Sequence, residues 1–275
     1  MTGEVFFKMT GSGNDFVFLD GRWSAPQDWP PERIRRVCAR GTGVGADGLV
    51  VLAPGSADGA VRFLFFNNDG SRAAMCGNAA LCAARLAALL ELASPDHVTL
   101  ETDAGPIRAR CEPGTDDRSE LFLPDVTEVR FPEIATAAGE GRIGFAVVGV
   151  PHLVVTVGDL GGIDLMGRGR TLRRHQTLAP AGANINFVAP NGDGWAMRTY
   201  ERGVEGETLA CGTGAVACAA VLAAAGLSTV PWSVETRSGT TLTVAGQAGR
   251  DGGLLAPRLG GEGRLVFRGM LGAGL

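Results

Sequence analysis

Short apolar runs recur along the whole chain, and turn residues separate them. They read EVFFKM, DFVFLD, GLVVLA, AVRFLFF, HVTLET, ELFLPD, GFAVVGV, LVVTV, NINFVA, WAMRTY, WSVET, TLTVAG and RLVFRG. Glycine, asparagine, aspartate or proline bounds each run, as is typical of β-strands. The pattern predicts a protein built mainly of strands.

Three segments interrupt this pattern and predict helices. Residues 76–92 and 211–227 are rich in alanine and leucine and apolar on nearly every face, which is typical of a helix enclosed by protein. Residues 31–40 predict a third, shorter helix.

The two apolar segments begin alike, almost half the chain apart. Their openings, MCGNAALCAARLAAL and ACGTGAVACAAVLAA, correspond without a gap, and an acidic or amide-rich segment precedes each of them. We infer an internal duplication with an α+β fold: two pseudo-symmetric domains, each a curved, mostly antiparallel sheet around a central helix. We expect domains at residues 1–119 and 120–265, with a C-terminal strand at about 266–275 returning to the first. Duplicated domains of this kind favour a ligand site in the cleft between them.

The composition narrows the possible chemistry. The 275 residues carry a formal net charge of −4, and their cations are scattered, so no nucleic-acid partner is expected. Lys8 is the sole lysine and lies in the first predicted strand, whereas a pyridoxal phosphate enzyme needs a Schiff-base lysine. The six cysteines form no C-x-x-C pair, so neither a zinc site nor a disulfide scaffold is expected. We therefore expect neither a cofactor nor a metal.

Membrane and export signals are also missing from the sequence. The most apolar stretch, residues 215–226, is about 12 residues long, whereas a membrane span needs roughly 20. The N-terminus lacks the apolar core and cleavage site of a signal peptide. We expect a cytoplasmic protein with a small-molecule substrate and no membrane partner.

Both apolar helices open with cysteine, glycine and a small polar residue. Cys76 and Cys211 stand where free backbone N–H groups favour a thiolate or a bound carboxylate. Two such cysteines on opposing helices suit the removal of a proton from one face of a carbon and its return to the other. A single nucleophilic thiol would need only one of them. The remaining cysteines, 38, 82, 111 and 218, are interpreted as small core residues.

Other polar residues stand at strand ends. Asn14, Asn67 and Asn184 can reach a ligand there, although turn chemistry also explains asparagine at such positions. The Glu201-Arg202 pair could equally be an exposed surface pair, and His152 a structural residue. Residues 43–48, GVGADG, resemble a phosphate loop but have no lysine and no helix after them.

Taken together, these segments resemble the diaminopimelate epimerase family. The resemblance rests on GSGNDFVFLD, GVGADGLVVL, FNNDGSRAAMCGNAA, GVPHLVV, GANINFV and RTYERGVEGETLACGTGA, in this order along nearly the whole chain. It implies an isomerase that interconverts LL- and meso-diaminopimelate without a cofactor, in lysine and peptidoglycan biosynthesis. It also implies a homodimer.

The resemblance assigns roles residue by residue. Cys76 and Cys211 would be the acid/base pair, and His152 and Glu201 would lie beside the thiols and help to set their protonation. Glu201 would also bind the substrate. The full set of substrate-binding residues would be Asn14, Asn67, Gly77, Asn78, Asn184, Glu201, Arg202, Gly212 and Thr213.

Two positions depart from the family pattern. Some members have glutamine where this chain has Gly48, and others have asparagine where it has Val150. Because the asparagine would contact the ligand, Val150 is the first place to look for altered specificity.

Rival functions for such a chain come from several classes of protein. They are a racemase for histidine or proline, an isomerase of the phenazine-biosynthesis type with a carboxylate base, an inactive binding protein and a cysteine hydrolase. Proline racemases typically carry histidine at the position of Asn78, which argues against proline as the substrate. The cysteines at both helix starts disfavour the carboxylate-base isomerase, the inactive binding protein and the cysteine hydrolase.

Overall fold

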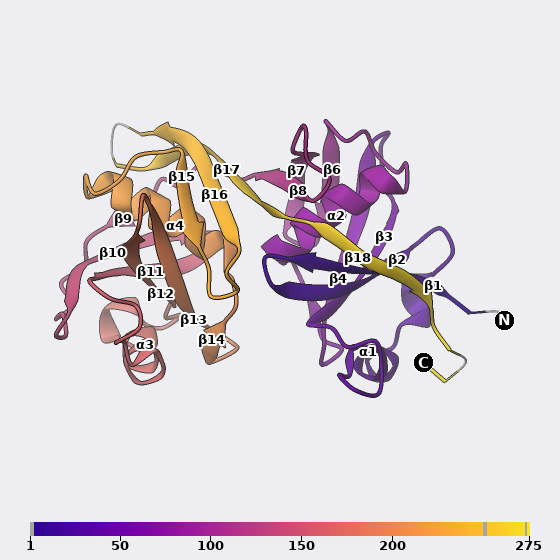
Figure 1. The fold of residues 1–275 in the computed structure, drawn as a ribbon, viewed down its shortest axis with the longest axis horizontal. Helices are drawn as coiled ribbons and strands as arrows, with labels where there is room; N and C mark the ends of the chain where they lie inside the picture. Colours follow the sequence, from indigo (N-terminus) through magenta and orange to yellow (C-terminus); the bar gives the residue numbers. More distant parts are fainter. Residues whose placement is uncertain (1–2, 250–251, 273) are drawn as a thin grey trace. The chain divides into compact units, whose positions relative to one another are not determined.

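The computed structural model describes residues 3–249, 252–272 and 274–275. The chain forms two compact units, one made of residues up to Leu121 and from Gly260 on, the other running from Phe122 to Leu259 (Figure 1). Each unit is a sheet of mostly antiparallel strands around one helix, so the predicted two-domain α+β fold is confirmed.

The first unit contains one extended set of paired strands. Their bounds are β1 (Val5–Gly11), β2 (Asn14–Asp20), β3 (Gly48–Pro54), β4 (Ala60–Asn67), β5 (Arg72–Ala73), β6 (Val98–Thr102), β7 (Gly105–Cys111), β8 (Arg118–Phe122) and β18 (Arg264–Met270). The pairs β18–β1, β1–β2, β3–β4, β4–β5 and β6–β7 are antiparallel, and β2–β3 and β4–β6 are parallel. The last strand of the chain thus pairs with the first.

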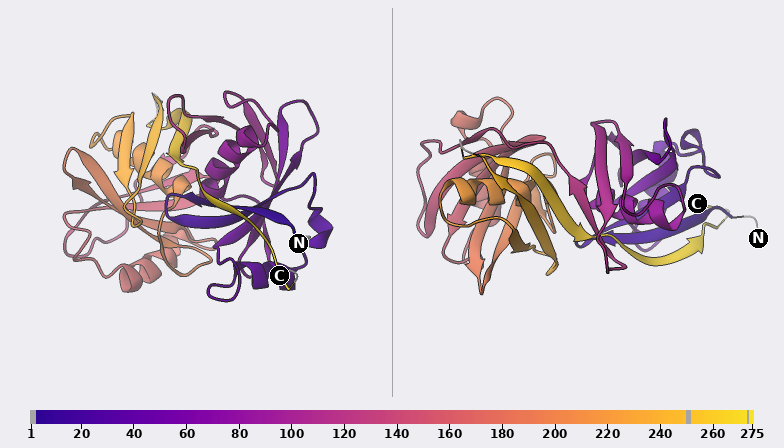
Figure 2. Two further views of the ribbon diagram at one scale, coloured as in Figure 1. Left: turned by 45° about the vertical axis from the view of Figure 1, so that its right-hand side comes forward. Right: turned by 90° about the horizontal axis from the view of Figure 1, so that it is seen from above.

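Helix α2 (Gly77–Leu89) fills the concave side of this sheet (Figures 1 and 2). It packs against β1, β2, β3, β4, β6, β7 and β18, and its residues from Asn78 to Ala84 are all buried. The short alanine side chains explain the fit, because they let strands approach the helix on several sides at once. The predicted enclosed helix at residues 76–92 is confirmed.

Helix α1 (Pro31–Cys38) covers the other face of the sheet. A buried cluster joins its Ile34 and Val37 to Val17, Leu49 and other alternate strand residues. Neighbouring strand residues point to opposite faces. The fully apolar runs of β2 and β3 therefore pack against α1 on one face and against α2 on the other.

The second unit repeats the same pairing scheme. Its strands are β9 (Val129–Arg130), β10 (Glu140–Val148), β11 (Val150–Val157), β12 (Asn184–Asn191), β13 (Gly194–Glu201), β14 (Gly206–Thr208), β15 (Trp232–Glu235), β16 (Thr241–Ala248) and β17 (Leu254–Glu262), whose last residues belong to the first unit. The pairs β9–β10, β10–β11, β12–β13, β13–β14 and β15–β16 are antiparallel, and β11–β12 and β13–β15 are parallel. This is the pairing order of the first unit, strand for strand, which confirms the duplication.

Helix α4 (Gly212–Ala224) is the counterpart of α2 and packs against β9, β10, β11, β12 and β16. Both helices have 13 residues, and α4 is buried along almost its whole length. The predicted helix at residues 211–227 is therefore confirmed.

Helix α3 (Leu165–Arg173) was not expected, because two glycines and four arginines over residues 164–174 hide its apolar face. Asp164 caps it by accepting a 2.9 Å hydrogen bond from the Gly167 N–H. A Cβ on Gly169 would lie 2.7 Å from the Tyr200 ring. Glycine is thus the residue that lets this helix pack closely on β13.

Strand β17 also was not expected from the sequence. Its residues, LLAPRLGGE, contain a proline and two glycines, which usually mark a turn rather than a strand. Tertiary pairing overrides that local signal.

Candidate active site

Cys76 and Cys211 each occupy the N-cap position of a central helix. Both have extended backbones, with φ of −138° and −135°, and their carbonyls accept the first helical hydrogen bonds, 2.9 Å from the N–H groups of Ala80 and Ala215. The N–H groups at a helix start have no acceptor within the helix and favour negative charge. Each helix start is therefore suited to a thiolate or to a bound carboxylate.

The surroundings of the two thiols differ. Cys76 is half-buried, whereas Cys211 is 8% exposed and its Sγ lies 3.7 Å from the Thr213 hydroxyl. A Cβ placed on Gly77 would have no described atom of a non-neighbouring residue within 4 Å, so a ligand can approach this backbone closely.

The other thiols on these helices behave as core residues. Cys82 and Cys218 are fully buried, and burial raises the pKa of both thiols well above its usual range. They remain protonated at neutral pH, in line with their interpretation as packing residues.

In the first unit, the structure brings Asn14 and Asn78 together. The Asn78 amide donates to Asn14 Oδ1 at 2.8 Å, and the Asn14 amide donates in turn to Asp47 Oδ2 at 2.8 Å. Asp47 belongs to residues 43–48, the segment that resembles a phosphate loop, and the strand β3 follows it rather than a helix. Asp47, which no pattern in the sequence singled out, holds the Asn14 amide in place.

Asn67 lies at the end of β4, opposite Gly48 of β3. Its amide donates to the Ser71 hydroxyl at 3.0 Å. A Cβ on Gly48 would lie 2.7 Å from both the Phe65 ring and the Phe66 carbonyl oxygen. A larger residue at this position would therefore require the strands to move, which gives the departure at Gly48 a structural cause.

In the second unit, three adjacent strands carry predicted residues on one face. His152 of β11 stands opposite Asn184 of β12, and Glu201 lies at the end of β13. Asn184 Oδ1 accepts a 2.8 Å hydrogen bond from the backbone N–H of Arg202. Burial raises the pKa of the Glu201 carboxyl, and the nearby Thr208 hydroxyl only partly opposes this rise. Glu201 is thus not an exposed surface residue.

Val150 lies two residues before His152, on the same side of β11. In the matching position of the first unit stands Asn14, two residues before Phe16 of β2. The Asn14 amide, which is hydrogen-bonded to Asn78 at the start of α2, therefore has no counterpart in the second unit. This places the departure at Val150 beside the predicted site residues.

His152 is completely buried, and its Nδ1 lies 3.2 Å from the Asn186 amide nitrogen. Burial lowers the pKa of this imidazole to about 3, and the charge of Arg202 adds to the effect. The ring is therefore neutral at physiological pH. Asn186 was not among the predicted site residues, although it lies two residues after Asn184 and hence on the same face of β12.

The low pKa of His152 predicts acid sensitivity of the fold. Between pH 6.5 and about 3 the unfolded chain binds a proton at this site that the folded protein does not, so the free energy of unfolding falls as the pH falls through this window. At pH 5 the expected loss from this group is about 2 kcal/mol relative to neutral pH. Urea unfolding at pH 7 and pH 5, for the wild type and His152→Gln, measures it. An equal loss in both proteins would contradict the prediction.

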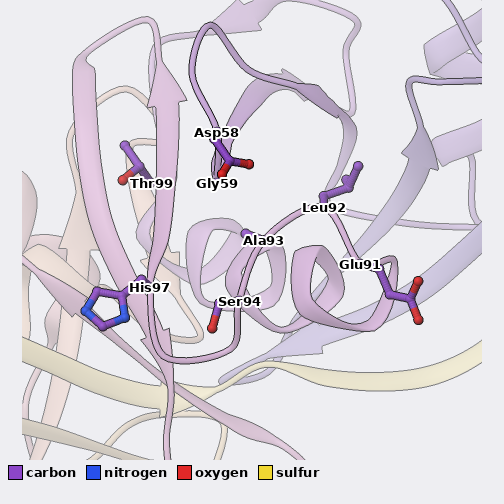
Figure 3. Close-up of a pocket in the computed structure, with 8 residues that line it drawn as sticks. All are labelled: Asp58, Gly59, Glu91, Leu92, Ala93, Ser94, His97 and Thr99. Atoms are coloured by element: carbon purple, nitrogen blue, oxygen red, sulfur yellow. The ribbon is translucent and has the colours of Figure 1, made fainter.

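One concave feature of the first unit lies elsewhere. A cavity of about 410 Å³ contains no predicted site residue, and its Glu91 and His97 side chains point away from each other (Figure 3). Its lining is Asp58, Gly59, Glu91, Leu92, Ala93, Ser94, His97 and Thr99. Because these groups do not converge on one point, the cavity is not the candidate site.

Neither a metal cluster nor a membrane-spanning helix occurs in the part of the chain that the structure describes. Over 3–249, 252–272 and 274–275, no three histidine, cysteine or acidic side chains are grouped closely enough to hold a metal ion. Within the same ranges, none of the helices has the length and apolar character that a membrane span needs.

The chain is similar to known proteins along most of its length. The family model described as diaminopimelate epimerase matches residues 6–120 and 144–251. The diaminopimelate epimerase of Gemmatimonas aurantiaca is 47% identical over 98% of this chain and 99% of its own length, and that of Aquifex aeolicus is 44% identical over 87% and 88%.

Two more distant solved structures share the fold. A hydroxyproline epimerase from Agrobacterium vitis superposes with a TM-score of 0.64 at 20% identity, covering 98% of this chain and 92% of that one. A phenazine biosynthesis protein of Bacillus anthracis gives 0.68 at 15% identity, covering 98% and 99%. Through its sequence relatives, the chain belongs to the diaminopimelate epimerase family.

Proposed function

We propose that this protein interconverts LL- and meso-2,6-diaminopimelate without a cofactor, as a step of lysine and peptidoglycan biosynthesis. The observation that carries the proposal is the pair of cysteines that begin the two central helices, one in each half of a duplicated fold. Whole-length identity of 47% to a diaminopimelate epimerase supports the same substrate.

Cys76 and Cys211 act as the acid/base pair. One cysteine, as thiolate, takes the α-proton, and the electron pair of the broken C–H bond moves into the α-carboxylate. The other cysteine, as thiol, then delivers its proton to the opposite face of the planar carbon. After one turnover the two sulfurs have exchanged protonation states, so the same pair serves both directions. The mechanism requires both helix starts to face one substrate, the arrangement that the sequence predicts.

The helix starts also stabilise the charge that develops. An α-proton of an amino acid is very weakly acidic, so the enzyme must stabilise the carboxylate as negative charge builds on it. Backbone N–H groups at Gly77-Asn78 and Gly212-Thr213, each at the start of its helix, would bind such a group without rearrangement during the reaction. Excluding water would strengthen this stabilisation.

The remaining predicted residues hold the substrate and tune the thiols. The polar groups of the substrate are bound by Asn14, Asn67, Asn184 and Arg202. Glu201 also binds the substrate and, together with His152, acts beside the thiols. The hydrogen bonds that fix Asn14 and Asn184 support this role, because they hold two of these side chains in one orientation before the substrate arrives.

The test is proton NMR of the reduced protein with LL-diaminopimelate in D2O, without added cofactor. We expect loss of the α-proton signal together with appearance of the meso isomer. Racemisation of proline or histidine instead, or no exchange with thiols confirmed reduced, would contradict the proposal. Turnover of diaminopimelate would also establish that Val150 is tolerated variation.

We further propose a cytoplasmic homodimer. Six cysteines in 275 residues, without the spacing of a disulfide scaffold, favour a reducing compartment. The C-terminal strand β18 exposes the apolar side chains of Leu265, Val266, Phe267 and Met270, each 36–48% exposed, and a second copy would bury some of them. Sedimentation equilibrium should give twice the 28.4 kDa chain mass.

A further inference from the structure

We propose that Asn186 is a positioning residue that fixes His152 as a neutral ring with its proton on Nε2, so that His152 acts as a hydrogen-bond donor and not as a base. The inference rests on the proposed function for the identity of the reaction, and on the geometry of β11, β12 and β13 for everything else.

The orientation of the Asn186 side chain is determined by its surroundings. Asn186 is completely buried, and its Nδ2 lies 3.2 Å from the backbone carbonyl oxygen of Leu153, which can only accept a hydrogen bond. Its Oδ1 accepts from the Thr199 hydroxyl at 3.0 Å. Exchanging the amide oxygen and nitrogen would place two acceptors against each other at Leu153, so only one orientation is satisfied.

This orientation determines the proton position on His152. The second N–H of the Asn186 amide faces His152 Nδ1 at 3.2 Å, so Nδ1 must accept. A neutral imidazole with an accepting Nδ1 carries its proton on Nε2. The charged ring, with protons on both nitrogens, would place two donors against each other, which agrees with the low pKa of this group.

The Nε2 donor is left for a ligand. It is fully buried and has no hydrogen-bond partner among the residues that the structure describes. Buried donors in proteins are nearly always paired. The start of α4 lies nearby, because a Cβ on Gly214 would clash with Asn186 Oδ1 and lie 3.1 Å from Cys211 Sγ. The geometry therefore points to an anionic acceptor at this helix start, the thiolate or the substrate carboxylate.

The first unit shows that the fold does not need this polar group. By the strand register, Phe16, Val50 and Phe65 occupy the positions that His152, Asn186 and Thr199 occupy in the second unit. All three are buried, and the rings of Phe16 and Phe65 pack edge to face with centroids 6.1 Å apart. The same place in the duplicated fold is therefore filled by apolar side chains in one half. Since packing at this place needs neither an imidazole nor an amide, His152 and Asn186 are argued to have a chemical role in the other half.

The first test needs no substrate. The chain has three histidines, at 97, 152 and 175, so ¹⁵N-histidine labelling gives three sets of ring signals, assigned with His97→Gln and His175→Gln. We expect the His152 signals at pH 7 to show a protonated Nε2 and an accepting Nδ1. A protonated Nδ1, alone or together with Nε2, would overturn the proposal even if diaminopimelate is turned over. If the spectrum is as expected but no epimerisation occurs, the proposed function fails while the tautomer stands.

The second test separates a donor from a base. In His152→Gln, the Asn186 amide can donate a hydrogen bond to the side-chain oxygen of the glutamine. The glutamine side-chain nitrogen then takes the position of the histidine Nε2 and can donate in its place. A donor role predicts that His152→Gln keeps kcat within about tenfold, while His152→Leu loses about 100-fold or more. If a folded His152→Gln is as inactive as His152→Leu, the donor role is wrong.

The third test addresses Asn186 itself. Asn186→Leu has a similar volume but no donor, and we expect kcat to fall about tenfold with KM changed less than about threefold. Thr199→Val is the matched control, because the carbonyl of Leu153 still orients the amide; its kcat should change less than about threefold. Equal kcat losses in both variants, or an unchanged kcat in Asn186→Leu, would overturn the positioning role. If Asn186→Leu does not fold, the ¹⁵N-histidine spectrum of the wild type and the comparison of His152→Gln with His152→Leu still test the proposal.

Discussion

Replacing Cys76 or Cys211 by alanine is expected to lower the rate of epimerisation by about 10³-fold or more, because each variant lacks either the base or the acid in each direction of the reaction. The remaining thiol can still remove an α-proton from the stereoisomer whose hydrogen faces it, and return a deuteron to the same face. Each variant should thus exchange one stereoisomer slowly with D2O without inverting it, and the two variants should select opposite stereoisomers. Proton NMR combined with chiral chromatography measures both quantities.

Two matched controls lie on the same helices. Cys82→Ala and Cys218→Ala remove the same atom from fully buried positions of α2 and α4, further along each helix. We expect these variants to lose some stability but to keep turnover within about threefold, because their thiols stay protonated and lie away from the helix starts. If Cys76→Ala or Cys211→Ala behaves like its control, the two-base mechanism is wrong.

Asp15→Asn is expected to destabilise the protein by about 3 kcal/mol, since it leaves a buried cation without its counter-charge. Lys8 is 7% exposed, and its ammonium lies 2.7 Å from Asp15 Oδ2 and also donates to the carbonyl of Gly45. Burial alone would raise the pKa of Asp15, but hydrogen bonds from Arg40 and Lys8 outweigh it and hold the pKa below its usual value. The loss is measured as the difference in the free energy of unfolding between Asp15→Asn and the wild type, from urea titrations that share one slope of free energy against urea concentration.

The controls for this prediction use one exposed pair and one double variant. Glu32→Gln breaks the ion pair with Arg35, in which both side chains are about half exposed or more, and should cost less than about 0.5 kcal/mol. The double variant Lys8→Met/Asp15→Asn removes both buried charges, so it should be more stable than Asp15→Asn alone. A double variant that is less stable than the single one would show that the ion pair is not the source of the effect.

This ion pair also bears on the site. Arg40 bridges Asp15 and Asp47 at 2.7 Å from each, and Asp47 holds the Asn14 amide. Weakening the pair should therefore loosen Asn14 and raise KM before it changes kcat.

The local signals in the sequence were sufficient for the parts of the fold that depend on short segments. The enclosed helices α2 and α4 follow from apolar residues on every face, and the duplication from the matching openings at Cys76 and Cys211. Helix α3 was missed because its glycines and arginines leave it few apolar residues. The close contact between Gly169 and Tyr200 of β13 explains one of the glycines and is visible only in the folded protein. Strand β17 was missed because its proline and two glycines usually mark a turn rather than a strand.

The sequence by itself determined the family, the two-domain α+β fold and the two cysteines at helix starts, because each is written in contiguous residues. Only the tertiary structure decided which side chains meet across strands. The register of β11, β12 and β13 places His152, Asn186 and Thr199 in one hydrogen-bonded set, and the loop before β3 brings Asp47 to Asn14. Such contacts depend on strand register, in which a shift of one residue turns every side chain to the opposite face. No local pattern in the chain records that register, so the proton position on His152 could be read only from the folded protein.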